Sequence, residues 1–189
     1  MSGKVASRDA SLFFFYMQEP DRSSGILVFS LTGSLPAGDL IMGKLVDVTG
    51  VMSTRGYDRE IAQPSVRIIG TGDPPRPLLL RNIEVAGTDF FYVPGPVRSG
   101  QRGAPGRRGP NNVGLYVRTT GRVIEHLGPV LFRIDDGSLP GGLLVSHEET
   151  WGQPPVGRLV EVFGYPQIDD PSGDGVLYMR GREAWRILD

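Results

Sequence analysis

The stretch FFFYMQ, which begins at Phe13, carries the aromatic side chains most able to take part in binding. In an extended strand successive side chains point to opposite faces, so Phe15 and Met17 share one face while Phe14 and Tyr16 share the other. We assign Phe15 and Met17 to the core, because apolar residues recur at the matching places of a second, similar segment. Phe14 and Tyr16 are then expected to point outward, where aromatic rings can stack on nucleobases for roughly 1–3 kcal/mol each. The alternative, in which both rings pack against another part of the protein, stays equally open.

Arginine side chains could supply the other half of such a site, the contacts to phosphate groups. The stretch VPGPVRSGQRGAPGRRGPNN contains four arginines and no acid. It resembles the disordered Arg/Gly segments that bind nucleic acid electrostatically. The alternative is a solvated loop in which arginine keeps a Gly/Pro-rich tract soluble. We predict a nucleic-acid-binding site made of Phe14, Tyr16 and eight arginines, which are Arg22, Arg55, Arg59, Arg98, Arg102, Arg107, Arg108 and Arg133.

The charge is distributed unevenly along the chain. Residues 1–92 contain nine basic and ten acidic side chains, and residues 93–112 contain four basic ones and no acid. Residues 113–189 contain seven basic and eleven acidic side chains. Because binding to the phosphate backbone requires basic surface, the acidic balance of residues 113–189 argues against nucleic-acid binding by that part alone.

The residues that catalysis or metal binding would need are scarce. The chain has no cysteine, which excludes disulfides, thiolate nucleophiles and zinc–thiolate sites. His126 and His147 are the only histidines, and neither belongs to a pattern with a nucleophile. Asp169, Asp170 and Asp174 have the spacing of calcium ligands but lack the distal Glu of an EF-hand, so a polar hairpin turn explains them better. We expect a protein without enzymatic activity, metal site or cofactor.

No apolar run is long enough to span a membrane, and the N-terminus has no apolar signal segment. We therefore expect no membrane association, and a cytoplasmic location if the N-terminus is native.

Three blocks of sequence occur twice, in the same order and at nearly constant spacing. FYMQEPDRSSGILV matches FRIDDGSLPGGLLV, GKLVDVTG matches GRLVEVFG, and Gly3-Lys4-Val5 matches Gly121-Arg122-Val123. Order and spacing kept over three blocks indicate two copies of one domain. We place the first domain with an extended connector at residues 1–92, an Arg/Gly/Pro-rich linker at 93–112, and the second domain at 113–189.

Each copy has the pattern of a β domain. LVDV and LVEV alternate apolar and acidic residues, the period of a half-buried strand, and no window sustains a helical period. The second copy is expected to form strands near residues 114–126, 129–135, 142–147, 157–165 and 175–188. Five short antiparallel strands in a unit of this size fit the Greek-key barrel called the OB-fold. The predicted fold is all-β, with two OB-fold barrels in tandem and little helix.

The blocks FYMQEPDRSSGILV, GDLIMGKLVDVTGVM, NNVGLYVRTTGRV and FRIDDGS resemble bacterial tandem OB-fold proteins of the nucleic-acid-binding OB-fold superfamily. The resemblance implies single-stranded DNA or RNA as the ligand, held on the outer face of strands two and three. The chain departs from the family pattern where SLTGSLPAGDL replaces the usual helix between strands three and four.

The competing hypothesis is a structural or protein-interaction module, possibly part of a longer chain, that does not bind nucleic acid. It predicts an exposed apolar patch near Phe14, Tyr16 and Leu27.

Two further expectations concern the connections. Residues 73–82 are too rich in proline for a central strand, so we expect them to run extended and to bury Leu78–Leu80, which would hold the two barrels rigidly. Because Gly3 aligns with Gly121, the first strand of the first barrel should be short and lie within Gly3–Arg8. We expect the edge that this leaves to be covered by residues 83–95, by a second molecule, by a protein partner or by upstream sequence.

Overall fold

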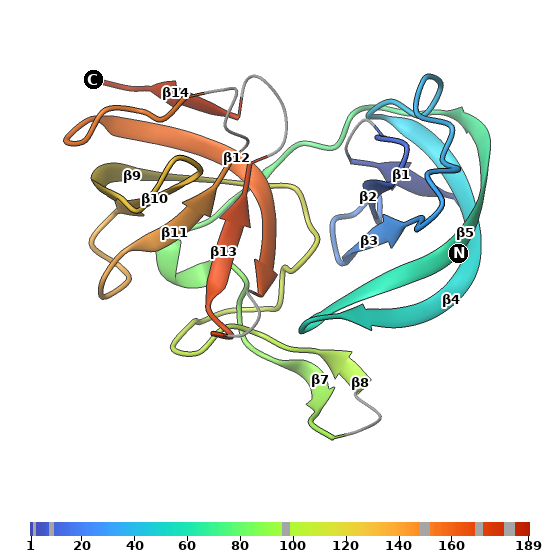
Figure 1. Cartoon of the computed structure of the whole chain (residues 1–189), viewed down its shortest axis with the longest axis horizontal. Helices are drawn as coiled ribbons and strands as arrows, with labels where there is room; N and C mark the ends of the chain where they lie inside the picture. The colour runs from blue at the N-terminus through green and yellow to red at the C-terminus, as the bar shows by residue number, and fades with distance from the viewer. Residues whose placement is uncertain (2, 8–9, 96–98, 148–151, 169–171, 180–183) are drawn as a thin grey trace.

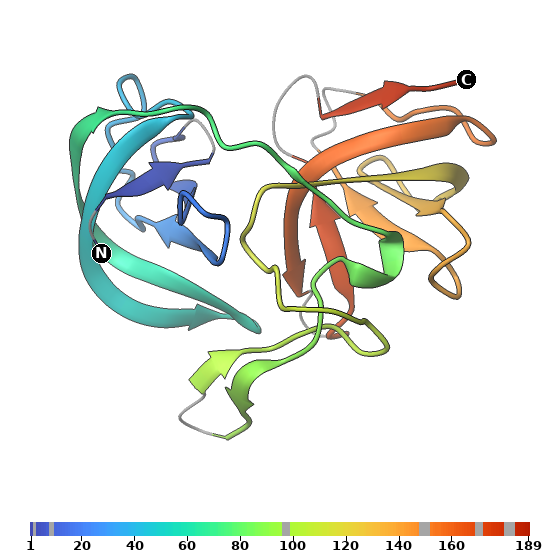
Figure 2. The ribbon, with the colours of Figure 1, turned by 180° about the vertical axis from the view of Figure 1, so that it is seen from behind.

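The computed structural model describes residues 1–189 except 2, 8–9, 96–98, 148–151, 169–171 and 180–183. Two β-barrels lie side by side, with a connector that crosses between them (Figures 1 and 2). Among the described residues the only helix is the short 3₁₀ helix η1 (Asn82–Glu84), and none is long and apolar enough to cross a membrane. The prediction of an all-β chain with two OB-like barrels is confirmed.

The first barrel is closed and follows the order β1-β2-β3-β5-β4. Strand β3 runs parallel to β5, and the other neighbours are antiparallel, which is the strand arrangement of the Greek-key OB barrel. The strands are β1 (Lys4–Ala6), β2 (Phe14–Gln18), β3 (Gly25–Phe29), β4 (Lys44–Arg55) and β5 (Asp58–Thr71).

The core of the first barrel follows the alternation of the sequence. Phe15 and Met17 of β2 are buried beside Val28 and Val46, as predicted. Between β3 and β4 the described residues form turns, with Leu35 and Leu40 buried, instead of a helix. The segment between β3 and β4 therefore contributes Leu35 and Leu40 to the core although it has no helix.

The second barrel repeats this arrangement with β9, β10, β11, β13 and β12, and closes through pairing of β12 with β9. The predicted fifth strand is in fact two strands. β13 pairs with β11 and with residues 165–168 of β12, whereas β14 pairs with residues 160–162 of β12. The strands are β9 (Val117–His126), β10 (Leu131–Asp135), β11 (Leu143–Ser146), β12 (Leu159–Ile168), β13 (Gly175–Tyr178) and β14 (Trp185–Ile187).

The first part of the connector is held on the second barrel. Strand β6 (Leu78–Leu79) runs parallel to β9, and Leu78 and Leu80 pack against the core of the second barrel while Leu79 is exposed. This agrees with the extended course expected for this stretch, but the expected burial is wrong for Leu79, which is 62% exposed. The strands of the first barrel end at Thr71, so β6 and η1 are associated with the second barrel rather than with the first.

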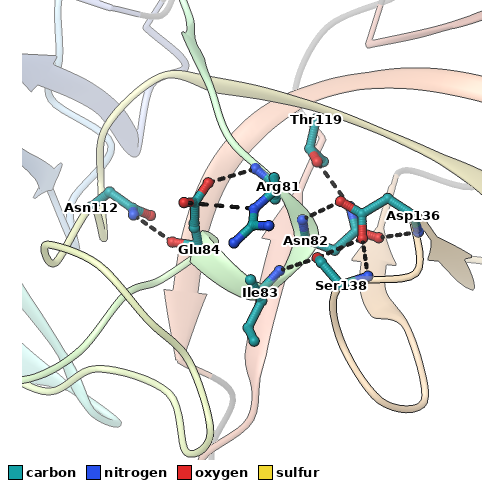
Figure 3. Close-up of polar contacts among 8 residues, drawn as sticks. All are labelled: Arg81, Asn82, Ile83, Glu84, Asn112, Thr119, Asp136 and Ser138. Atoms are coloured by element: carbon teal, nitrogen blue, oxygen red, sulfur yellow. Dashed lines mark hydrogen bonds and ion pairs between the residues drawn. The ribbon is translucent and has the colours of Figure 1, made fainter.

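Asn82 fixes the end of this stretch through a buried polar network (Figure 3). Its side-chain amide donates to Thr119 Oγ1 at 2.8 Å and to the carbonyl of Thr120 at 3.0 Å, and its Oδ1 accepts from the backbone of Asp136 at 3.1 Å. Burial works to raise the pKa of Asp136, but hydrogen bonds from Ser138 and from the Asn82 backbone outweigh it, and the pKa lies below its ordinary value.

The later part of the connector forms an arm and a packed loop. The arm consists of β7 (Phe90–Val93) and β8 (Ser99–Gln101), which pair with each other and project from the barrels (Figure 1).

Strand β1 is short, as predicted, and pairs with both β2 and β4. The expectation that residues 83–95 cover an open edge of β1 is therefore wrong, because β7 pairs with β8 instead.

Candidate nucleic-acid interface

The outer face of β2 and β3, where the sequence predicted base stacking, is covered by the second barrel. Tyr16 stacks on Tyr165 of β12 with ring centroids 4.0 Å apart and 7° between the ring planes. Only 1% of Tyr16 is exposed. We call the apolar contact between the barrels the tyrosine interface; it comprises Phe14, Tyr16, Leu27, Phe29, Tyr116 and Tyr165.

The structure thus matches the alternative in which Phe14 and Tyr16 pack against another part of the protein. Phe14 is half-buried at the edge of the tyrosine interface, and its ring meets that of Tyr16 edge-on at 6.5 Å. Tyr16 points out of its own barrel, as predicted, but has no open face for a base. The alternation of β2 identified the outward face correctly and could not identify what covers it.

Hydrogen bonds across the tyrosine interface fix the two barrels against each other. The hydroxyl of Tyr165 donates to the carbonyl of Ser7, and the Gln167 amide donates to the hydroxyl of Tyr16. The backbone N–H of Tyr116 donates to Gln18 Oε1 at 3.2 Å. Because these bonds accompany a closely packed apolar contact, the pair of barrels is built as one body.

Asp58 adds a buried carboxyl group to the same junction. Its two oxygens accept from the backbone N–H of Ile168 at 3.0 and 3.3 Å, and Gln101 Nε2 lies 3.5 Å from Oδ1. Burial raises the pKa of Asp58 to about 7, although both hydrogen bonds act to lower it. Desolvation is therefore the stronger effect.

The predicted arginines of the first barrel are dispersed and take part in local contacts. Arg22 is exposed in the turn after β2, with a positive φ of 63°. Arg55 forms an ion pair with Glu60 at 2.8 Å and lies 3.6 Å above the ring of Phe29. Arg59 donates to Thr54 Oγ1 at 3.1 Å. Arg55 and Arg59 lie near the turn of the β4–β5 hairpin, whereas Arg22 lies in the turn between β2 and β3.

The arginines of the predicted linker belong to an ordered loop, not to a disordered segment. Arg102 stacks on the ring of Tyr57 at 4.1 Å, and Arg107 donates to the carbonyls of Asn82 at 2.8 Å and Gly175 at 3.1 Å. Arg108 is exposed. Arg98 lies outside the described residues. The hypothesis of a disordered segment is wrong for residues 99–112, because these long-range contacts fix the loop.

Two arginines predicted from the sequence do converge, on the second barrel. A cleft of about 150 Å³, which we call the arginine cleft, is lined by Arg107, Arg133, Asp174 and Leu144, together with Pro105, Leu139, Pro140, Gly142 and Gly175. Arg133 projects from β10, next to Leu144 of β11. The arginine cleft therefore lies on the strand pair that forms the usual ligand face of an OB barrel.

The arginine cleft combines two arginines with two acidic groups, Asp174 and Glu125. Burial lowers the pKa of Arg107 to about 10; the charge of Asp174 opposes this shift and the like charge of Arg133 adds to it. Arg107 stays charged at neutral pH, and among the described residues it forms no ion pair within 4.0 Å. Arg133 is paired with Glu125 at 2.9 Å and donates to the carbonyl of Gly141. A phosphate group in the cleft could contact both guanidinium groups, in competition with Asp174 and Glu125.

Sequence reasoning overlooked the residues that close the first barrel's face. Phe163 and Tyr165 alternate on β12 in the same way as Phe14 and Tyr16 on β2, so a signal for a second outward aromatic pair was present. Nothing in the spacing showed that Tyr165 would stack on Tyr16.

No protein-family model and no curated protein sequence matches the chain. Among solved structures, the chain is similar to a murine DNA-binding protein bound to double-stranded DNA, with a TM-score of 0.46 and 10% sequence identity. The alignment covers 99% of this chain and 93% of that chain. A similarity of this extent carries no argument about the ligand of this chain.

Proposed function

We propose that the chain is a non-catalytic module that binds single-stranded nucleic acid on the β10–β11 face of its second barrel. The observation that supports this is the arginine cleft, in which Arg107 and Arg133 line one hollow on that face. The corresponding face of the first barrel is closed by the tyrosine interface. Membership in the bacterial tandem OB-fold proteins is part of the same proposal.

The acidic groups around the arginine cleft set the strength of this binding. Glu125 pairs with Arg133, and Asp174 lies in the cleft. An oligonucleotide must compete with these carboxylates, so we expect modest affinity that falls steeply with salt, because counterion release drives phosphate binding.

Titration of a fluorescein-labelled oligothymidine of about 15 nucleotides, a length within the range of OB-fold sites, tests the proposal. We expect Arg133→Gln to lower the affinity and to reduce the salt slope by about one. Arg67→Gln is the matched control, since Arg67 is an exposed arginine on β5 of the first barrel. No binding at micromolar protein and low salt, or equal losses in both variants, would refute the proposal.

The opposite substitution gives a gain of affinity. In Glu125→Gln the guanidinium of Arg133 loses its carboxylate partner but keeps its charge, so we expect tighter binding of the same oligonucleotide at low salt. The gain should vanish at high salt, where exposed charges are screened. Unchanged or weaker binding at low salt would show that Arg133 is not a phosphate contact.

A protein-interaction module is the second candidate. The apolar patch expected near Phe14, Tyr16 and Leu27 is buried in the tyrosine interface, so that form of the hypothesis is wrong. Exposed apolar side chains occur instead on the long β4–β5 hairpin, where Val51 is 58% and Met52 is 48% exposed. Absence of oligonucleotide binding would favour this candidate.

A further inference from the structure

The arm contains an irregular strand pair that places two aromatic rings together. Phe90 pairs with Gln101 and Val93 pairs with Ser99, so two residues of β7 lie opposite one residue of β8. This is the geometry of a β-bulge, which turns side chains away from the regular alternation. Phe91, at the bulge, has a positive φ of 49°. A non-glycine residue in this conformation is strained.

The bulge determines where the two rings lie. On a regular strand Phe90 and Phe91 would point to opposite faces. In the arm their ring centroids are 4.9 Å apart with an interplanar angle of 73°. Phe90 is 59% and Phe91 is 81% exposed. The contact therefore buries little apolar surface that could offset the strain of Phe91, which makes a role in binding the better explanation.

A cleft opens beside Phe90, between the arm and the first barrel. It has a volume of about 200 Å³, and its wall includes Met17, Ile26, Arg59, Phe90 and Val113. Gln101 and Asn111 also line it, but their side-chain amides donate to backbone carbonyls. Sites for drug-sized ligands usually occupy about 300–1,000 Å³, so this cleft suits a single flat group.

The charge of the surrounding chain suits a polyanion. From Val85 to Asn112 the sequence has four arginines and one acid, Asp89. The carboxylate of Asp89 accepts from the backbone N–H of Gly103. The loop after the arm continues to Pro105 and Arg107, which line the arginine cleft. The two clefts are thus joined by one basic stretch of chain.

We propose that Phe90 and Phe91 form a base-stacking platform for single-stranded nucleic acid, with one nucleobase entering the cleft beside Phe90. The proposal rests on the proposed function and adds a base contact outside both barrels. Stacking tolerates any base, because every base has a π face. The platform would hold the bases while the arginine cleft binds phosphate.

The test compares two labelled probes of equal length, oligothymidine and an abasic sugar–phosphate oligomer. The variants are Phe90→Ala and Phe91→Gly, with Phe13→Ala as the matched control because Phe13 is a 50% exposed aromatic residue on another surface. Both arm variants should weaken oligothymidine binding about tenfold and leave binding of the abasic oligomer unchanged. Phe13→Ala should change neither.

Phe91→Gly separates loss of stacking from loss of folding. Glycine adopts a positive φ without strain, so the melting temperature of this variant should stay the same or rise while its affinity falls. Wild-type affinity of both arm variants for oligothymidine would overturn the base-stacking platform and leave the arginine cleft intact. Failure of the unmodified protein to bind either probe would overturn the proposed function itself.

Discussion

Asp58 is a carboxyl group enclosed where the barrels meet, and its ionisation is coupled to folding. Its pKa is about 7 in the folded chain against an ordinary value of 3.8. Between these values the folded state binds a proton that the unfolded state has released, so the stability gained from protonation decreases as the pH rises. This contribution is full below about pH 4 and is lost through about pH 7.

Asp58→Asn should remove this pH dependence. Asparagine keeps an oxygen that can accept from Ile168, but it does not titrate. The free energy of unfolding of the wild type should fall relative to the variant between pH 4 and 7, by about 1.4 kcal/mol for each unit of the pKa difference. Urea denaturation at several pH values measures it. Parallel pH profiles would contradict the assignment, since every other ionisable group is common to both proteins.

At the scale of the strand, the sequence predicted what local alternation controls. The apolar period placed Phe15 and Met17 in the core, and the repeated blocks predicted two barrels. Contacts between segments that are distant in the sequence could not be predicted from this alternation. Tyr165 covers Tyr16 from another barrel, and the arginine-rich loop is ordered because Arg107 reaches carbonyls on η1 and β13. A composition rich in Arg, Gly and Pro does not reveal such long-range partners.

The β6–η1 segment gives a prediction at this scale. Asn82→Ala removes the hydrogen bonds to Thr119 and Thr120 and leaves the backbone N–H of Asp136 without its acceptor. Each buried group left unpaired costs about 1–3 kcal/mol. We expect a lower urea midpoint and faster amide exchange of Leu78 and Leu80, which donate to the backbone of the second barrel. An unchanged midpoint and unchanged exchange would show that the network does not hold β6.

For the whole molecule, the decisive feature is the close approach of the two barrels. Gly25 of β3 lies against Gly114, where a Cβ atom at Gly25 would sit 2.5 Å from the Gly114 carbonyl oxygen. Only residues without side chains permit this contact. Together with the tyrosine interface it implies that the barrels tumble as one unit, which NMR relaxation of residues in β2 and β12 would measure.

Gly25→Ala should therefore destabilise the assembled pair. The added methyl group meets backbone atoms that cannot rotate away, so we expect a loss of about 1–3 kcal/mol, typical of overpacking. Gly38→Ala is the matched control, because no atom lies within 4 Å of a Cβ at that position. Differential scanning calorimetry should show a lower melting temperature only for Gly25→Ala. Equal melting temperatures of the two variants would mean that the barrels can separate without cost.

The tyrosine interface also has a consequence for the order of events on the ribosome. All strands of the first barrel have been synthesised at Thr71, but Tyr165 is made much later. At roughly 5–20 residues per second, a first barrel that closes at once would display Tyr16 and Leu27 to solvent for several seconds. During that interval the apolar surface formed by Tyr16 and Leu27 is accessible to chaperones and to neighbouring nascent chains. The exposure ends when β12 emerges and Tyr165 covers this surface.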